Sequence, residues 1–183
     1  MSSQKTIFQT LENRENPDHV EEFGPFLCNN KNAWLGKGYY FWDTFVENAH
    51  WWGKNNGSNN DYFICETHID YNKELCLDLH GDTEKLLELG DIINEFKRQN
   101  LLRSNSTVVE IIRFLQKQNL FKYPSIRVSS QKFNNDRFQV KFDKKNPSKF
   151  ELKPLIQICV YDLKKVNLDS FKIVYPEEYS IQL

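Results

Sequence analysis

The spacing of apolar residues changes along this chain of 183 residues, and that change limits the folds open to it. Apolar residues alternate with polar ones, or form short runs near turn residues, in segments that predict strands: 5–10, 36–42, 61–70, 73–79, 125–130, 155–163 and 170–176. Residues 83–100 and 107–119 instead carry apolar side chains three and four positions apart, which predicts two helices. Thr107 and Glu110 have the spacing of a capping box at the start of the second helix. Strands towards both ends of the chain, with a helical hairpin inserted between them, predict an α+β fold.

Length and charge narrow the class of protein further. A chain of this length is most consistent with one domain, and no repeat or linker divides it, so we treat residues 1–183 as a single domain. The 24 Lys and Arg residues against 25 Asp and Glu leave a net charge of -1, which creates no overall field attracting nucleic acid or an anionic membrane. The start, MSSQKTIFQT, has no apolar targeting segment, and no apolar run reaches membrane-spanning length. We therefore expect a cytoplasmic protein with no membrane partner, and the sequence leaves its oligomeric state open.

The cysteines are expected to be reduced and structural. Cys28, Cys65, Cys76 and Cys159 show no CxxC spacing, and the last three lie inside apolar strand-like runs, where a buried thiol behaves as a small hydrophobic group. The alternative is that a cysteine pairs with a histidine and acts as the nucleophile of a hydrolase. Nothing in the sequence around Cys159 marks a lowered thiol pKa, so we favour the structural interpretation.

One polar strand face offers a possible metal site. Alternation places Glu66, His68 and Asp70 on the same side of a strand, where they form a plausible ligand set. The same pattern is typical of the solvated side of a half-buried antiparallel pair. We favour the solvated face and predict no metal.

The densest aromatic stretch, WLGKGYYFWDTFVENAHWW (34–52), also has two interpretations. In the first, Gly36 and Gly38 form a turn that enters a core strand, and Asp43 caps the helix that follows. In the second, the glycines let a ligand approach the backbone, while Tyr40 and Trp51 line a cleft for a flat aromatic group. Tyr39 and Tyr40 point to opposite faces in either case.

Two segments resemble one known family. GKGYYFWDTFVENAHWW (36–52) resembles a segment of the ADP-ribosyltransferase superfamily, especially its poly(ADP-ribose) polymerase branch, and LIQICVYDLKKVNLDSFKI (155–173) is similar to the last catalytic strand of that family. The segments occur in the expected order near opposite ends of the chain. The resemblance implies a divergent, bacterial-type member with two packed, mainly antiparallel sheets around a cleft for NAD.

The resemblance also implies roles for residues of the aromatic stretch. Tyr40 matches the tyrosine that stacks on nicotinamide, with Gly38 and Tyr39 beside it, and Trp51 matches the aromatic that closes the ring sandwich. Asn48 falls where the family has a small polar residue, usually serine, that binds the nicotinamide amide.

The family's opening motif, His-Gly-Ser/Thr, is replaced here by Phe8, Gln9 and Thr10. Either Phe8 or Gln9 occupies the histidine position, and the register stays open. Gln9 or Thr10 retains the capacity to hydrogen-bond the ribose or the carboxamide.

The family's catalytic glutamate is replaced by Gln157. Cleavage of the nicotinamide–ribose bond passes through an oxocarbenium-like state that a carboxylate stabilises. An amide keeps a hydrogen bond and loses the charge, a change worth on the order of 3 kcal/mol or about a hundredfold in rate. The resemblance therefore implies a mono-ADP-ribosyltransferase whose catalytic set is Gln157, Tyr40 and Gln9, with NAD as substrate and no metal.

Two further functions remain open within the resemblance. The chain is either an NAD- or ADP-ribose-binding module that has lost turnover, or a relative that transfers a 2′-phosphate from RNA to NAD. The acceptor is unidentified and is a protein, a nucleic acid or a small molecule. The charged stretch 134–149 is either a surface that recognises the acceptor or a solvated loop. The resemblance also leaves open that the protein is exported as a toxin or effector.

Overall fold

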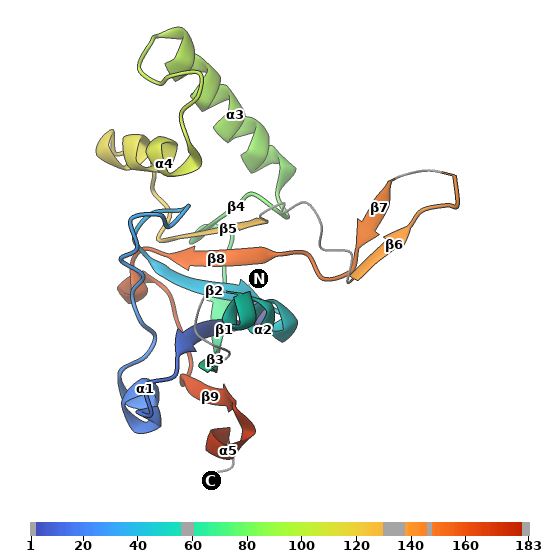
Figure 1. Cartoon of the computed structure of the whole chain (residues 1–183). Helices are drawn as coiled ribbons and strands as arrows, with labels where there is room; N and C mark the ends of the chain where they lie inside the picture. The colour runs from blue at the N-terminus through green and yellow to red at the C-terminus, as the bar shows by residue number, and fades with distance from the viewer. Residues whose placement is uncertain (1–2, 56–60, 130–137, 146–147, 181–183) are drawn as a thin grey trace.

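A seven-stranded mixed sheet forms the centre of the protein (Figure 1). The computed structural model describes residues 3–55, 61–129, 138–145 and 148–180. The strand order is β4-β5-β8-β2-β1-β3-β9, and the neighbours are antiparallel except for the parallel pair β4 and β5. The strands of this sheet are β1 (Ser3–Glu12), β2 (Tyr39–Asp43), β3 (Tyr62–Tyr71), β4 (Cys76–Asp78), β5 (Ser125–Ser129), β8 (Ile156–Val160) and β9 (Lys172–Tyr175). A separate two-stranded hairpin consists of β6 (Gln139–Lys141) and β7 (Lys149–Glu151).

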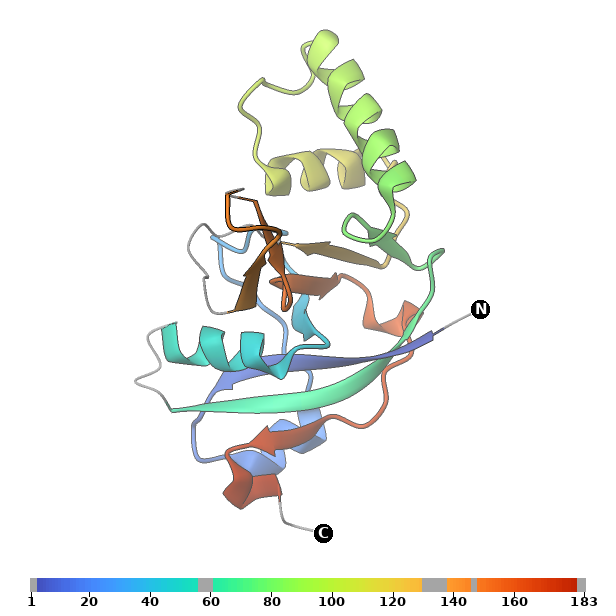
Figure 2. The same cartoon turned by 90° about the vertical axis from the view of Figure 1, so that its right-hand side faces the viewer.

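The helices lie around this sheet and at one end of it. They are α1 (Pro17–Phe23), α2 (Val46–Asn55), α3 (Thr83–Arg98), α4 (Val108–Lys117) and α5 (Glu177–Ser180), with a short 3-10 helix at Leu163–Lys165. Figures 1 and 2 show α3 and α4 standing beyond the β4 edge and α2 lying across the middle of the sheet. Within the part of the chain that the structure describes, no helix combines the length and the apolar character needed to cross a bilayer.

The predicted α+β class is confirmed, because every segment expected to be a strand contains one and both expected helices are present. The strands join into one sheet rather than the two packed sheets that the resemblance implied. The physical reason is that β1 pairs with β3 along its whole length and also with β2. β1 and β2 are joined only by the pairs Ile7–Asp43 and Phe8–Trp42, which is the shortest pairing between neighbouring strands of this sheet.

Alternation along the strands buries both faces of the sheet. One face, called here the α1 face, carries Ile7, Phe41, Phe63 and Ile158, and a core forms there with Val20 of α1. The other, called the α2 face, carries Phe8, Trp42, Ile64, Cys159 and Ile126, and packs against α2 and α4. Fully burying one such side chain stabilises the fold by about 1.5–3 kcal/mol.

Both helices of the hairpin begin at a residue whose side chain caps the first turn. Thr107 Oγ1 accepts a hydrogen bond from the Glu110 amide at 3.4 Å, and Glu110 Oε2 accepts one from the Thr107 amide at 2.8 Å, so the predicted capping box is confirmed. Asp82 caps α3 in the same way, accepting from the amides of Glu84 and Lys85.

Thr107→Ala is expected to lower the free energy of unfolding by about 1 kcal/mol, because amide groups of the first turn of α4 lose their side-chain acceptor. Urea unfolding followed by circular dichroism measures the change. Thr107→Ser keeps the hydroxyl and is the matched control, expected to stay close to the parent. Equal losses in the two variants would mean that the methyl group, and not the cap, matters at this position.

Asp43 is the one capping prediction that is wrong. It is the last residue of β2, and α2 begins three residues later, at Val46. Between them Thr44 adopts a φ of 65°, which turns the chain off the sheet. The Asp43 side chain lies on the α1 face of the sheet, where its carboxylate contacts Arg127 and Lys5 instead of the first turn of α2.

Candidate functional site

The two segments that carry the family resemblance lie side by side. β2 and β8 are hydrogen-bonded neighbours, with Tyr40 opposite Cys159 and Trp42 opposite Gln157. Residues directly opposite in an antiparallel pair share a face, so Tyr40, Trp42 and Gln157 all point to the α2 face. Tyr40 and Gln157 are therefore diagonal neighbours on adjacent strands, although they are far apart in the chain.

The segment 34–36 lies against both of these residues. Trp34 Nε1 donates a hydrogen bond to Gln157 Oε1 at 2.8 Å. The Tyr40 hydroxyl accepts from the Leu35 amide at 3.1 Å and donates to the Gly36 carbonyl at 2.7 Å. Gly36 has a φ of 87°, which a residue with a side chain rarely adopts, so the glycine allows the turn that brings this segment back over Tyr40.

The hydrogen bonds set the chemical character of both groups. Burial, followed by the neighbouring Cys159, raises the pKa of Tyr40, so its hydroxyl stays neutral. An indole N–H donates and never accepts, so the atom of Gln157 that faces Trp34 is the amide oxygen. The Nε2 group, a donor, is left to meet any ligand at Gln157.

Trp51 packs against Trp42 rather than against Tyr40. The Trp42 and Trp51 rings meet edge to face, with their centroids 6.3 Å apart and their planes at 88°, and Trp52 lies 6.1 Å from Trp42. Tyr40 belongs to a different cluster, with Leu35 and Cys159. The face therefore offers two aromatic groups separated along β2, and Trp51 belongs to the group of Trp42 rather than to that of Tyr40.

The opening motif is divided between the two faces of the sheet. Phe8 pairs with Trp42, so Phe8 and Thr10 share the α2 face, where Phe8 is buried and Thr10 Oγ1 donates to the Ala49 carbonyl of α2 at 3.0 Å. Gln9 lies between them in β1 and points to the α1 face. Strand alternation therefore places Gln9 and Gln157 on opposite sides of the sheet, and the structure does not bring these two residues of the expected catalytic set together.

The Gln9 amide has a structural role where it stands. Its Nε2 donates to the Phe26 carbonyl at 2.9 Å, and its Oε1 accepts from the Phe26 amide at 2.8 Å. This pair of bonds fastens the segment after α1 to β1. A weaker hydrogen bond of 3.4 Å runs from Gln9 Nε2 to the Tyr40 carbonyl, so the Gln9 side chain also contacts the backbone of β2.

The remaining residues of the resemblance hold elements together. Asn48 is fully buried, and its Nδ2 donates to the Pro154 carbonyl at 3.0 Å, which ties α2 to the segment entering β8. A Cβ on Gly38 would lie 2.4 Å from Cys159 Sγ, so the glycine is required by close strand packing. Tyr39 points to the opposite face from Tyr40 and packs against the α1-face core.

The cysteines are free, and Cys65, Cys76 and Cys159 are buried, as predicted. Burial raises the pKa of Cys159 to about 12, and that of Cys76 to about 12 as well. A nucleophilic thiol needs a lowered pKa, so these thiols are unsuited to covalent catalysis.

The polar side of β3 makes its contacts with the chain after β8. His68 Nδ1 lies 3.9 Å from Asp169 Oδ2, and Asp70 Oδ2 accepts a hydrogen bond from Asn167 Nδ2 at 3.1 Å. Among the described residues, the His, Cys, Asp and Glu side chains form no group of three placed to hold a metal ion.

A buried network of charges that the sequence did not reveal lies on the α1 face, behind Gln157. Arg127 of β5 donates from Nε to Asp43 Oδ2 at 2.6 Å and from Nη1 to Asp78 Oδ1 at 3.0 Å. Tyr71 donates to the other Asp78 oxygen, and Lys5 Nζ lies 3.7 Å from Asp43. The strand order puts β8 between β5 and β2, so the network links the two neighbours of the strand that carries Gln157.

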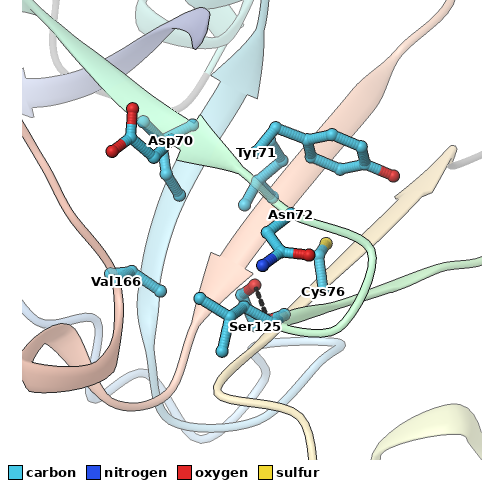
Figure 3. Close-up of a pocket in the computed structure, with 9 residues that line it drawn as sticks. Asp70, Tyr71, Asn72, Cys76, Ser125 and Val166 are labelled. Atoms are coloured by element: carbon cyan, nitrogen blue, oxygen red, sulfur yellow. Dashed lines mark hydrogen bonds between the residues drawn. The ribbon is translucent and has the colours of Figure 1, made fainter. Parts of the chain in front are cut away.

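A small cavity also lies on the α1 face, between the end of β3 and the start of β5 (Figure 3). Its lining includes Tyr71, Asn72, Cys76, Ser125 and Val166, and Ser125 Oγ donates to the Leu75 carbonyl at 2.7 Å beside it. The volume is about 10 Å³, room for about one water molecule. This cavity is too small to hold an organic substrate, so it is not a candidate substrate site.

Comparison with family models, with curated proteins and with solved structures finds no significant match. The resemblance to ADP-ribosyltransferases therefore consists of the two sequence segments alone. Trp34 and Trp42 belong to this face and were not among the predicted residues. Alternation from Tyr40 was a signal for Trp42, whereas nothing local in the sequence pointed to Trp34.

Proposed function

We propose that the chain binds NAD on the α2 face at Tyr40, Trp42 and Gln157, and that it transfers ADP-ribose from NAD to an acceptor slowly. The observation that carries the proposal is the placement of Tyr40 and Gln157 as diagonal neighbours on adjacent strands, pointing to the same side. Nicotinamide stacks on the ring of Tyr40, and the ribose lies towards Gln157. Aromatic stacking of this kind contributes about 0.5–1.5 kcal/mol beyond burial.

The hydrogen bond from Trp34 determines what Gln157 contributes. With Oε1 turned to the indole, Gln157 presents Nε2, which donates a hydrogen bond to a ribose hydroxyl oxygen. A neutral donor does not stabilise the positive charge that develops on the ribose as the glycosidic bond breaks. Slow turnover follows from this orientation.

The same hydrogen bond favours a second candidate, an NAD- or ADP-ribose-binding module without turnover. In that case Gln157 serves recognition only. On either proposal the indole of Trp34 stays bonded to Gln157 Oε1 while Nε2 meets the ribose. Binding is then expected to change the fluorescence of Trp34, because the ligand lies beside its half-buried indole.

NAD at a hundredfold excess over its Kd is expected to stabilise the protein by about 2.7 kcal/mol, measured as an increase in Tm, and to release nicotinamide on long incubation. Tyr40→Ala is expected to abolish both effects, because the stacking surface is removed. Tyr39→Ala is the matched control: the same change on the neighbouring residue, whose ring points to the opposite face, is expected to keep both.

Three results would count against the proposal. Wild-type protein that shows no increase in Tm with NAD or with nicotinamide would refute binding at this face. If Tyr40→Ala and Tyr39→Ala lost the NAD-dependent increase in Tm equally, the loss would reflect a less stable protein and not a lost contact with the ligand. Binding without any nicotinamide release would refute transfer and leave the binding module.

A further inference from the structure

The hairpin of β6 and β7 has one apolar face that the rest of the protein leaves exposed. Figure 1 shows the hairpin standing away from the seven-stranded sheet, and its register places Val140 opposite Phe150. Alternation puts Phe142 and Leu152 on the same face. All four side chains are exposed: Val140 by 51%, Phe142 by 68%, Phe150 by 55% and Leu152 by 52%.

Two of these side chains form an aromatic platform. The Phe142 and Phe150 rings meet edge to face with centroids 6.3 Å apart, so the outer surface of each ring is open to a partner. An isolated two-stranded hairpin is marginally stable, and an apolar face of this kind is typical of a binding surface.

Positive charge lies on the opposite face of the hairpin, where Lys141 is paired with Lys149, and at its end, where Lys144 and Lys145 follow Asp143. The described residues 138–145 and 148–153 contain Lys141, Lys144, Lys145, Lys149 and Lys153 against Asp143 and Glu151, which is five positive against two negative charges, a net of about +3. The whole chain has a net charge of -1, so this hairpin is positive within a protein that otherwise has a negative balance. Lys141, Lys144 and Lys145 are exposed, while Lys153 Nζ lies 4.6 Å from the Phe138 ring and also contacts Glu47.

We infer that the hairpin binds single-stranded nucleic acid. Exposed aromatic rings stack on unpaired bases, and lysines beside them neutralise the phosphates, which is how many proteins bind single strands without sequence preference. Each strand spans about 10 Å, so the platform accommodates a few nucleotides. This inference is independent of NAD binding, since it uses none of the residues of the α2 face.

The position of the charges favours a nucleic acid over a membrane. The end of the hairpin carries Asp143, Lys144 and Lys145, and the apolar side chains lie behind this end along one face. Insertion of the tip into a bilayer would bury an acidic side chain and two lysines before it buried either ring, at a high cost. A single-stranded nucleic acid that lies along the face stacks its bases on the rings, and its phosphates reach Lys144 and Lys145 at the end of the hairpin.

The test uses the full chain and a fluorescein-labelled oligothymidine of roughly 12 nucleotides, with binding followed by fluorescence anisotropy up to about 100 µM protein. Wild-type protein is expected to bind, and the affinity is expected to fall about sevenfold between 50 and 200 mM salt, since about two lysine contacts release counterions. Phe142→Ala and Phe150→Ala are each expected to weaken binding at least about fivefold. Phe23→Ala is the matched control, because Phe23 is 59% exposed on α1, away from the hairpin, and it is expected to bind like the parent.

Each of the other results would overturn the inference. If wild-type protein did not bind, or if the Phe142→Ala and Phe150→Ala variants bound as tightly as wild type, the platform would be excluded as the binding site. Equal affinity for a duplex of the same length would show that charge alone acts. Binding to vesicles of phosphatidylserine and phosphatidylcholine without binding to the oligonucleotide would assign the hairpin to a membrane surface. The variants lie outside the central sheet, so an unchanged Tm is expected and shows that lost binding is not lost folding.

Discussion

Arg127→Ala is expected to lower the free energy of unfolding by about 3–5 kcal/mol, the largest stability loss among the substitutions proposed here. Arg127 pairs with Asp43, which is 1% exposed, and with Asp78, which is 6% exposed. Removal of the guanidinium leaves two buried carboxylates without their shared cation. Urea unfolding of the purified variant measures the loss.

The pH dependence of that loss has a defined sign. Burial alone would raise the pKa of Asp78, but hydrogen bonds from Tyr71 and Gly81 and the charge of Arg127 outweigh it and hold the pKa below its ordinary value. A carboxylate with a lowered folded-state pKa contributes stability that is complete well above about pH 4 and is lost as the pH falls through the folded-state pKa. In Arg127→Ala the carboxylates no longer benefit from the cation, so the difference from wild type is expected to shrink below about pH 4.

Arg127→Lys is the matched control. It keeps a positive charge and loses the fork that reaches both carboxylates, so an intermediate loss is expected. A loss below about 1 kcal/mol in Arg127→Ala, or a difference from wild type that grows in acid, would show that the network does not stabilise the fold as described.

Gln157→Glu is expected to raise the rate of nicotinamide release from NAD at least about 100-fold. The carboxylate adds the negative charge that stabilises the developing oxocarbenium ion, and the N–H of Trp34 remains available as a donor to one of its oxygens. The substitution adds no atom beyond the amide's own shape, so the packing between β5 and β2 is preserved. Release of nicotinamide is followed by chromatography at saturating NAD.

The controls for this gain use Tyr40. Gln157→Glu combined with Tyr40→Ala is expected to lose the gain, because the ligand is no longer held beside the new carboxylate. If Gln157→Glu binds NAD and releases nicotinamide no faster than the parent, the chain is a binding module and position 157 is not where the charge develops. If the double variant keeps the gain, nicotinamide does not stack on Tyr40.

Local features of the sequence were sufficient for most of the secondary structure. Helix and strand periods are properties of neighbouring residues, so α3, α4 and the strands of the central sheet were predicted from spacing alone, whereas β6 and β7 were not. The Thr107 cap was predicted for the same reason, since its partner is only three residues away. Asp43 shows the limit of local signals. Aspartate is a common capping residue, but the carboxylate of Asp43 is bound by Arg127, which is 84 residues away in the chain.

The candidate site was predicted in part. Tyr40 and Gln157 were expected to lie close together, and their strands are neighbours. The structure does not bring Gln9 together with Gln157, because the register of β1 turns Gln9 to the other face, and register is decided by pairing between distant strands. Trp34 was missed because its contact with Gln157 depends on how a turn at Gly36 returns over β2.

The sequence by itself determined the α+β class, the helical hairpin, the strands and the buried thiols, because each depends on the order and spacing of residues near one another. Only the tertiary structure decided that seven strands form one sheet, that Trp34 contacts Gln157, and that a charged network lies behind Gln157. These features are contacts between segments distant in the chain. Their free energies depend on strand order, register and burial, which no short stretch of sequence contains.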